Sequence, residues 1–212
     1  MTRDDYSKTS FSNDATKKIL GFEYQKLIAL ECCLNSKPGD IIYIECYGDV
    51  STEDTIIETK NHLEKINMTD QSPDFWKTLR NFVKEKEITT QYSKLILHTS
   101  AAVKEESIFS NWNKKNCDEK LRLIEHFKES PNCSIKEFSD FIFNFNDSYQ
   151  ENDLLEVLEK LELHVSQPNV IEKLNELKGH PVFSIVDEKY RDNFLTYLHG
   201  YITKKAIDDR NQ

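Results

Sequence analysis

Apolar residues recur at roughly helical spacing between residues 13 and 35. They are Ile19, Leu20, Phe22, Leu27, Ile28, Leu30 and Leu34. After the turn signal Pro38-Gly39-Asp40, the pattern changes to short apolar runs rich in β-branched residues, which are typical of strands. We therefore predict a helix over residues 13–35, a buried strand over Ile41–Cys46 and a second strand over Thr55–Asn61.

Another helix is predicted to begin at Ser72-Pro73-Asp74, after a polar connection. A hydroxyl cap, a proline in the first turn and an acid at the positive end of the helix dipole all favour helix initiation. This helix extends to residue 87 and is expected to bury Phe75, Trp76, Leu79, Phe82 and Val83. An interior strand over Lys94–Thr99 and a helix over Lys104–Asn111 follow.

The second half of the chain has mostly helical periodicity. Helices are predicted over Asp118–Glu129, Ser134–Phe143, Asn152–Lys160, Pro168–Lys178 and Asp187–Ile207. Residues 161–166 are either one more strand or an extended linker. No internal repeat or Gly-, Ser- or Pro-rich linker divides the chain. The simplest organisation is a flexible tail over 1–12 and a single domain over 13–212, with an α/β core over 13–112 and a helical extension over 113–212.

Composition supports a soluble globular protein. An apolar fraction of 38% in 212 residues suffices for a packed core. No apolar run reaches the ~20 residues that span a bilayer, and the N-terminus lacks the apolar centre of a signal peptide. Five cysteines without a C-x-x-C pair argue against a secreted disulfide framework. We expect a cytoplasmic protein without a membrane partner.

The net charge of −9 argues at first sight against a nucleic-acid partner, because phosphate binding uses Lys and Arg. Acidic residues that hold a cation, however, reverse the local sign of the charge. The charge therefore neither supports nor excludes DNA, and it predicts weak, salt-sensitive binding by the isolated chain.

Candidate chemistry is concentrated between Ile41 and His62. In a strand over residues 55–60, Glu58 and Lys60 project from one face while Thr59 points to the other. A fold-back through residues 51–54 would bring Asp49 beside Glu58. Mg²⁺ prefers hard oxygen ligands, which Asp49, Glu58 and the Thr59 carbonyl could supply. Lys60 would then orient a water or stabilise transition-state charge, and Glu45 would serve a second cation or hold Lys60.

Ordinary explanations exist for each of these residues. Glu and Lys two positions apart often form a surface ion pair worth less than ~1 kcal/mol. Gln25 fits the solvated face of the first helix. His62 either has a structural role or contacts a phosphate. His98 is expected to be hydrogen-bonded within its strand. The basic residues Lys77, Arg80, Lys84 and Lys86 are either a solvated helix face or a track for phosphates.

Several common chemistries have no motif in this sequence. There is no Gly-rich phosphate loop, no Cys/His set with zinc spacing and no G-x-S-x-G elbow. Nucleotide hydrolysis by a Walker-type site, zinc chemistry and serine hydrolysis are therefore disfavoured.

Five motifs occur in an order that resembles one known family. They are G-F-x-Y-Q at 21–25, an apolar run ending in E-x-x-G-D at 45–49, E-x-K at 58–60, T-D-x-S-x-D-F-W-K-T-L-x-N at 69–81, and K-L-I-L-H-T-S at 94–100 before Trp112. Together they are similar to the double-stranded-DNA endonuclease domain of CBASS-type anti-phage effectors, a branch of the PD-(D/E)xK superfamily. The resemblance covers residues 20–112.

The resemblance implies a restriction-endonuclease-like fold, a mixed central sheet flanked by helices. It also implies that Asp49 and Glu58 bind Mg²⁺, for which Mn²⁺ would substitute, that Lys60 is the catalytic lysine, and that Gln25 and Glu45 border the site. Many members of the family carry Gln where Glu58 stands. Family members usually continue into a sensor domain, which nothing here resembles. The chain is then an excised nuclease domain or a subunit whose sensor resides on another polypeptide.

These observations give a leading hypothesis and two alternatives. The leading one is a Mg²⁺-dependent endonuclease of bacterial defence that cuts double-stranded DNA and is activated by oligomerisation, as a homo-oligomer or with a separate sensor subunit. His62, Lys77, Arg80 and Lys84 are its candidate DNA contacts. The alternatives are a non-catalytic, nuclease-like interaction subunit and an RNA nuclease. The RNA nuclease stays open because no residue in the sequence indicates whether the substrate carries a 2′-hydroxyl, which is what distinguishes RNA from DNA.

Overall fold

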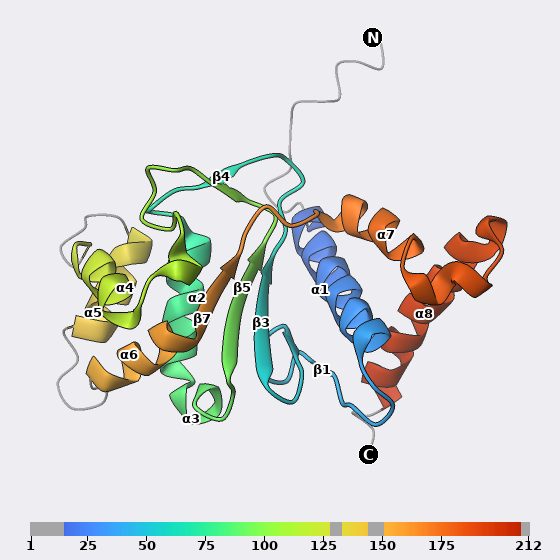
Figure 1. Ribbon diagram of the computed structural model, residues 1–212, viewed down its shortest axis with the longest axis horizontal. Helices are drawn as coiled ribbons and strands as arrows, with labels where there is room; N and C mark the ends of the chain where they lie inside the picture. Colours follow the sequence, from blue (N-terminus) through green and yellow to red (C-terminus); the bar gives the residue numbers. More distant parts are fainter. Residues whose placement is uncertain (1–14, 128–132, 144–150, 209–212) are drawn as a thin grey trace, which may run out of the picture.

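A mixed β-sheet lies between two layers of helices in the computed structural model, which describes residues 15–127, 133–143 and 151–208 (Figure 1). The sheet has the order β1-β2-β3-β5-β7. Its strands are β1 (Tyr43–Ile44), β2 (Val50–Ser51), β3 (Thr55–Lys60), β5 (Lys94–Thr99) and β7 (Leu161–His164). The first three pair antiparallel, and β3, β5 and β7 pair parallel, so the fold is α/β with a mixed sheet.

The first layer of helices covers one face of the sheet. It comprises α2 (Pro73–Lys84), α3 (Lys86–Thr89), the 3₁₀ turn η2 (Trp112–Lys114), α4 (Cys117–Glu125), α5 (Cys133–Phe143) and α6 (Glu151–Lys160). Ile56, Leu95 and Leu97 of the sheet pack here against Phe75 and Trp76, all at most 2% exposed. This aromatic core fixes α2 against β3 and β5.

The opposite face carries α1 (Thr16–Asn35), α7 (Val170–Lys178), the 3₁₀ turn η3 (Pro181–Ile185) and α8 (Glu188–Asp208) (Figure 1). Ile57 and Ile96 point into this second core. Tyr24 donates its hydroxyl to the Pro168 carbonyl at 2.8 Å, and the buried Lys173 of α7 pairs with Glu31 of α1 at 3.0 Å. These polar contacts hold α7 against α1.

The outer edge of β7 is closed by side chains. Asn113 donates to the Leu163 carbonyl and accepts the Leu163 N–H, as a neighbouring strand would. Trp112 and Lys120 donate to the Leu161 carbonyl at 3.0 and 2.9 Å. Exposed strand edges invite pairing with another chain, and this edge has its polar groups satisfied.

A small separate ladder lies near the carboxyl ends of β3 and β5. It pairs β4 (Asn67–Met68) with β6 (Ala102–Val103) in parallel. In the described part of the chain, no helix has the length and apolar character needed to cross a bilayer.

Several sequence predictions are confirmed, including α1, β3, α2 and β5, and residues 161–164 are a strand. The buried strand over Ile41–Cys46 is wrong. Only Tyr43–Ile44 pair, at the sheet edge, Ile41 is 59% exposed, and the positive φ of Glu45 (56°) turns the chain back.

The helix over Lys104–Asn111 is also wrong, because tertiary hydrogen bonds compete with helical ones there. The Asp70 carboxylate accepts from the Ser107 hydroxyl at 2.6 Å and from the Ile108 N–H at 3.0 Å. The segment forms turns instead. The tail over 1–12 and the end of the helix over Asp118–Glu129 lie outside the described residues.

Candidate active site

Glu58 and Lys60 lie together at the carboxyl end of β3. Lys60 Nζ is 3.1 Å from Glu58 Oε2, and their side chains are 29% and 13% exposed. They share the face of Ile56, which packs against α2, whereas Ile57 packs on the α1 side. The alternation expected for a strand thus holds, and it directs an acid and an amine toward the N-terminal end of α2.

Asp49 immediately precedes β2 and is anchored to Thr59. Its Oδ2 accepts the Thr59 N–H at 2.7 Å and the Thr59 hydroxyl at 2.8 Å. The N–H and C=O of one strand residue point toward the same neighbouring strand, so the Thr59 carbonyl also faces the Asp49 side. Asp49 and the Thr59 carbonyl therefore border the same edge of β3.

Burial and a surplus of carboxylates together set the electrostatics of this site. Burial raises the pKa of Glu58, the charges of Asp49 and Glu45 raise it further, and the net shift is upward despite Lys60. Burial alone lowers the pKa of Lys60, but the carboxylates of Glu58, Asp49 and Asp74 outweigh it, so its pKa is raised. Lys60 therefore stays protonated at neutral pH, while ionised Glu58 is incompletely compensated.

His62 follows β3 and contacts the first turn of α2. Its Nε2 lies 2.7 Å from Asp74 Oδ2, and its backbone N–H donates to the Ser100 hydroxyl at 2.8 Å. Asp74 therefore links His62 to the electrostatics of Lys60. Sequence reasoning used Asp74 only as a helix-start residue and missed this second role.

Gln25 and Glu45 are placed differently with respect to the centre. Glu45 is exposed, its N–H donates to the Asp49 carbonyl at 3.0 Å, and its charge reaches Glu58. Gln25 is half-buried on α1 and makes no hydrogen bond with Asp49, Glu58 or Lys60. The structure therefore brings Glu45 into the electrostatics of the site and gives no contact that joins Gln25 to it.

The oxygen donors at this site are of the chemical kind that Mg²⁺ prefers. Among the described residues, no three or more His, Cys, Asp or Glu side chains gather to hold a metal ion. Mg²⁺, however, usually takes only one or two protein carboxylates and fills its other positions with water and phosphate oxygens. Asp49, Glu58 and the Thr59 carbonyl are hard oxygen donors of this kind. Burial is the largest cause of the raised pKa of Glu58, and repulsion by Asp49 and Glu45, which a cation would relieve, adds to it.

The basic candidates on α2 form a row on one face of the helix. Lys77 and Lys84 are exposed, and Arg80 between them pairs with Glu137 of α5 at 2.8 Å. Arg80 thus connects two helices, while Lys77 and Lys84 have their side chains in solvent.

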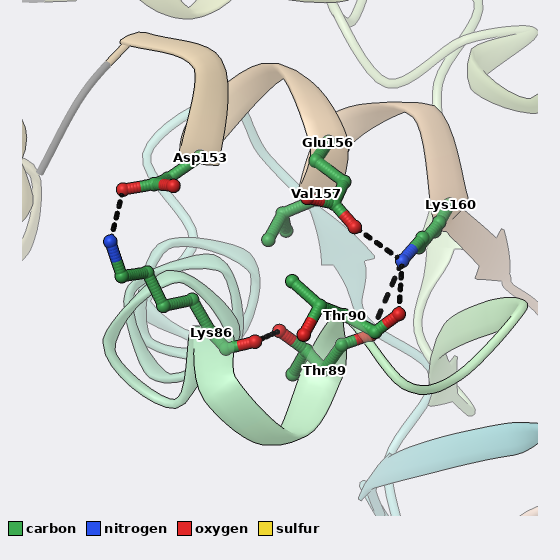
Figure 2. Close-up of a pocket in the computed structure, with 7 residues that line it drawn as sticks. All are labelled: Lys86, Thr89, Thr90, Asp153, Glu156, Val157 and Lys160. Atoms are coloured by element: carbon green, nitrogen blue, oxygen red, sulfur yellow. Dashed lines mark hydrogen bonds and ion pairs between the residues drawn. The ribbon is translucent and has the colours of Figure 1, made fainter.

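Two hollows in the surface of the described residues lie away from this centre. A cavity of about 10 Å³ lies between α3 and α6, where Lys86 pairs with Asp153 and Lys160 with Glu156 (Figure 2). That volume holds about one water molecule. A shallow groove of about 630 Å³ lies between the end of α1 and the β2–β3 turn. Neither is lined by Asp49, Glu58 or Lys60.

His98 is buried in the core, but the hydrogen bond predicted for its side chain is not found in the described part of the chain. It is 7% exposed, and its Nε2 has no hydrogen-bond partner within the described residues. Burial and the charge of Lys173 lower its pKa to about 3, so the ring is neutral. It points to the α1 side, since it alternates with Leu97, and thus away from Glu58.

Comparisons with known proteins leave the family of this chain open. No protein family model matches the sequence, and no curated protein gives a significant match. Among solved structures, the Moraxella osloensis Cap4 SAVED/CARF-domain containing receptor aligns with a TM-score of 0.43 and 17% identity. The alignment covers 89% of this chain and 44% of the receptor, so the chain spans less than half of that protein. A likeness this distant carries no functional conclusion.

Proposed function

We propose that this protein is a divalent-cation-dependent endonuclease that hydrolyses phosphodiester bonds of double-stranded DNA and serves in anti-phage defence. The observation that carries the proposal is the Glu58–Lys60 pair, 3.1 Å apart and largely buried, with Asp49 bordering the same end of β3. The resemblance of the five sequence motifs to the nuclease domain of anti-phage effectors supplies the substrate and the biological role.

In this proposal Asp49, Glu58 and the Thr59 carbonyl hold Mg²⁺ or Mn²⁺. When bound, the cation neutralises charge on the phosphate and lowers the pKa of a water molecule. Thr59 fixes the Asp49 carboxylate through two hydrogen bonds, so the ligand needs little reorganisation.

Lys60 acts as a fixed positive charge in the proposed reaction. Its raised pKa keeps the ammonium protonated, so it is unsuited to remove a proton from water. It can instead donate hydrogen bonds to a phosphate oxygen or orient the attacking water, which stabilises the charge that develops in the transition state.

Duplex binding in this proposal uses the surface next to the site. His62 borders the catalytic residues, and Lys77, Arg80 and Lys84 continue along α2. When the duplex binds, Arg80 releases Glu137, with which it pairs in the free chain, and contacts a phosphate instead. Since the whole chain carries a charge of −9, we expect weak binding that decreases steeply with salt.

Calorimetric titration with Mn²⁺ tests the proposed metal site. The wild type is expected to bind the ion, and Asp49→Asn and Glu58→Gln are each expected to weaken binding at least about tenfold, which is 1.4 kcal/mol. Glu53→Gln is the matched control, because Glu53 is exposed in the adjacent β2–β3 turn. Unchanged binding in Asp49→Asn and Glu58→Gln contradicts the assignment.

The alternative function is a nuclease-like interaction subunit without catalysis. The ion pair between Arg80, a candidate phosphate contact, and Glu137 of α5 favours it, since it occupies that cation within the chain. In that case the wild type binds no Mn²⁺ through Asp49 and Glu58. An RNA nuclease gives the same calorimetric result as a DNA nuclease, and cleavage of duplex DNA against RNA separates the two.

A further inference from the structure

Four exposed aromatic side chains form a stripe along α8. Tyr190, Phe194, Tyr197 and Tyr201 follow the spacing i, i+4, i+7, i+11, which keeps them on one side of a helix. They are 55%, 38%, 70% and 50% exposed. We call these four residues the aromatic stripe.

The aromatic stripe lies beside the side of α8 that contacts the core, and within the described residues only Phe194 of the four makes an aromatic contact with it, with its ring 5.6 Å from the buried Phe183. Leu195 is 1% exposed, and Leu198 and Ile202 pack against the same buried cluster. These three positions lie about 100° around the helix from the stripe, taking 100° per residue. The fold of one copy thus buries one apolar side of α8 and leaves a second one in solvent, which is typical of an interaction surface.

The order of residues along the stripe is symmetrical. The gaps between its members are four, three and four residues, so reversing the helix reproduces the pattern. A second α8 running antiparallel would place Tyr190 against Tyr201 and Phe194 against Tyr197. This is the self-complementary arrangement that a two-fold interface requires.

The two ends of the stripe carry opposite charges. Asp187 lies three residues before Tyr190, and Lys205, with Lys204 beside it, lies four residues after Tyr201. Both ends are exposed. Antiparallel pairing brings Asp187 of one copy to the lysines of the other, whereas parallel pairing opposes like charges.

We propose that the aromatic stripe of α8 binds the aromatic stripe of a second copy of this chain in antiparallel orientation. Aromatic side chains bury about 150–250 Å² each, so the exposed parts of these four supply about 400 Å² per copy. This is about half of the ~800 Å² per partner of a stable interface, and the flanking side chains contribute the remainder.

The pairing leaves the catalytic surface uncovered. The α8 helix lies on the α1 side of the sheet (Figure 1). Glu58 and Lys60 alternate along β3 with Ile57 and share the face of Ile56, which packs on the α2 side. Each copy of the pair thus keeps its own β3 site open. The inference rests only on α8 and stands independently of the nuclease proposal, because association is measured without DNA or metal.

Sedimentation equilibrium of the full chain is the first test. The wild type is expected to form dimers at concentrations of about 100 µM or below. Tyr197→Arg is expected to raise the dissociation constant at least about tenfold, and Thr196→Arg, exposed on the other side of the same helix, is expected to leave it unchanged. A monomeric wild type overturns the proposal, as does equal association by all three proteins.

A charge exchange tests the antiparallel orientation. Asp187→Lys alone and Lys204→Glu with Lys205→Glu are each expected to weaken association, because like charges then meet at both ends. Mixing the two variants restores opposite charges at both ends, so a heterodimer as tight as the wild-type dimer is expected. Circular dichroism shows whether the variants, all altered at exposed positions, keep the fold. A mixture that associates no better than either variant alone overturns the orientation.

Discussion

Removing the charge of Lys60 should expose the excess negative charge of the site. In a Lys60→Met variant, Glu58 keeps its burial and its neighbours Asp49 and Glu45 but loses its cation. Breaking a fully buried pair costs about 3–5 kcal/mol, and an exposed pair is worth less than about 1 kcal/mol. With exposures of 13% and 29%, we expect about 2 kcal/mol at neutral pH, which lowers the Tm by about 4–8 °C in a chain of this length.

The pH dependence of the stability loss in Lys60→Met shows whether the unpaired Glu58 carboxylate causes that loss. A carboxyl group whose pKa is raised in the folded state stabilises the fold while it is protonated. That stabilisation is lost as the pH rises through the pKa of the group in the folded state. The cost of Lys60→Met should therefore be smaller at about pH 5 than at about pH 8, because a raised pKa favours protonated Glu58 at the lower pH. Thermal unfolding of both proteins at the two pH values measures it.

Two further variants control this result. Glu58→Gln should cost less than Lys60→Met, because Lys60 retains the charges of Asp49 and Asp74. The double variant should be more stable than Lys60→Met alone, since no buried charge is then left unpaired. If the loss in Lys60→Met is the same at both pH values, the account of the site's electrostatics is wrong.

Two other predictions concern the fold around the site. Gly48→Ala should destabilise by about 2–3 kcal/mol, because Gly48 has φ +78° and an added Cβ would lie 2.6 Å from Ile56 Cγ2. Gly39→Ala should cost about 1 kcal/mol, because Gly39 has φ +101° but an added Cβ would lie in open space. Denaturant titration of both variants measures these losses of stability. The pKa of about 3 for His98 means that the unfolded chain binds more protons below about pH 6.5, so stability falls as pH drops from there. His98→Phe should reduce that slope between about pH 7 and 5, and an unchanged slope contradicts the assignment to His98.

Local patterns predicted the parts of the fold whose causes are local. The proline in the first turn of α2 and the period of its apolar residues fix that helix, and the alternation along Thr55–Lys60 fixes which side chains share a face. The predicted hydroxyl cap is wrong, because Ser72 makes no cap hydrogen bond and its hydroxyl accepts the Thr69 N–H instead. The same alternation was enough to pair Glu58 with Lys60. These inferences needed no knowledge of residues far along the chain.

The parts that could not be predicted depend on distant contacts or on backbone conformation. Residues 41–46 have the composition of a buried strand, but the left-handed Glu45 and Gly48 make a tight return that leaves only two residues paired. Residues 104–111 do not form a helix, because Ser107 and Ile108 donate hydrogen bonds to the Asp70 carboxylate, which is over 30 positions away in the sequence. The roles of Asp74 and Thr59 in the site likewise appear only when β2, β3 and α2 are brought together.

Duplex cleavage tests the central proposal most directly. Supercoiled plasmid is incubated with concentrated protein and Mg²⁺, using the wild type, Asp49→Ala and Lys60→Ala, with Glu53→Gln as the control outside the site. We predict linear or nicked product with the wild type and control, and at least about a hundredfold less with Asp49→Ala and Lys60→Ala, a difference of about 2.7 kcal/mol. Equal activity in all four proteins, or none in the wild type with Mg²⁺ or Mn²⁺, contradicts the proposal.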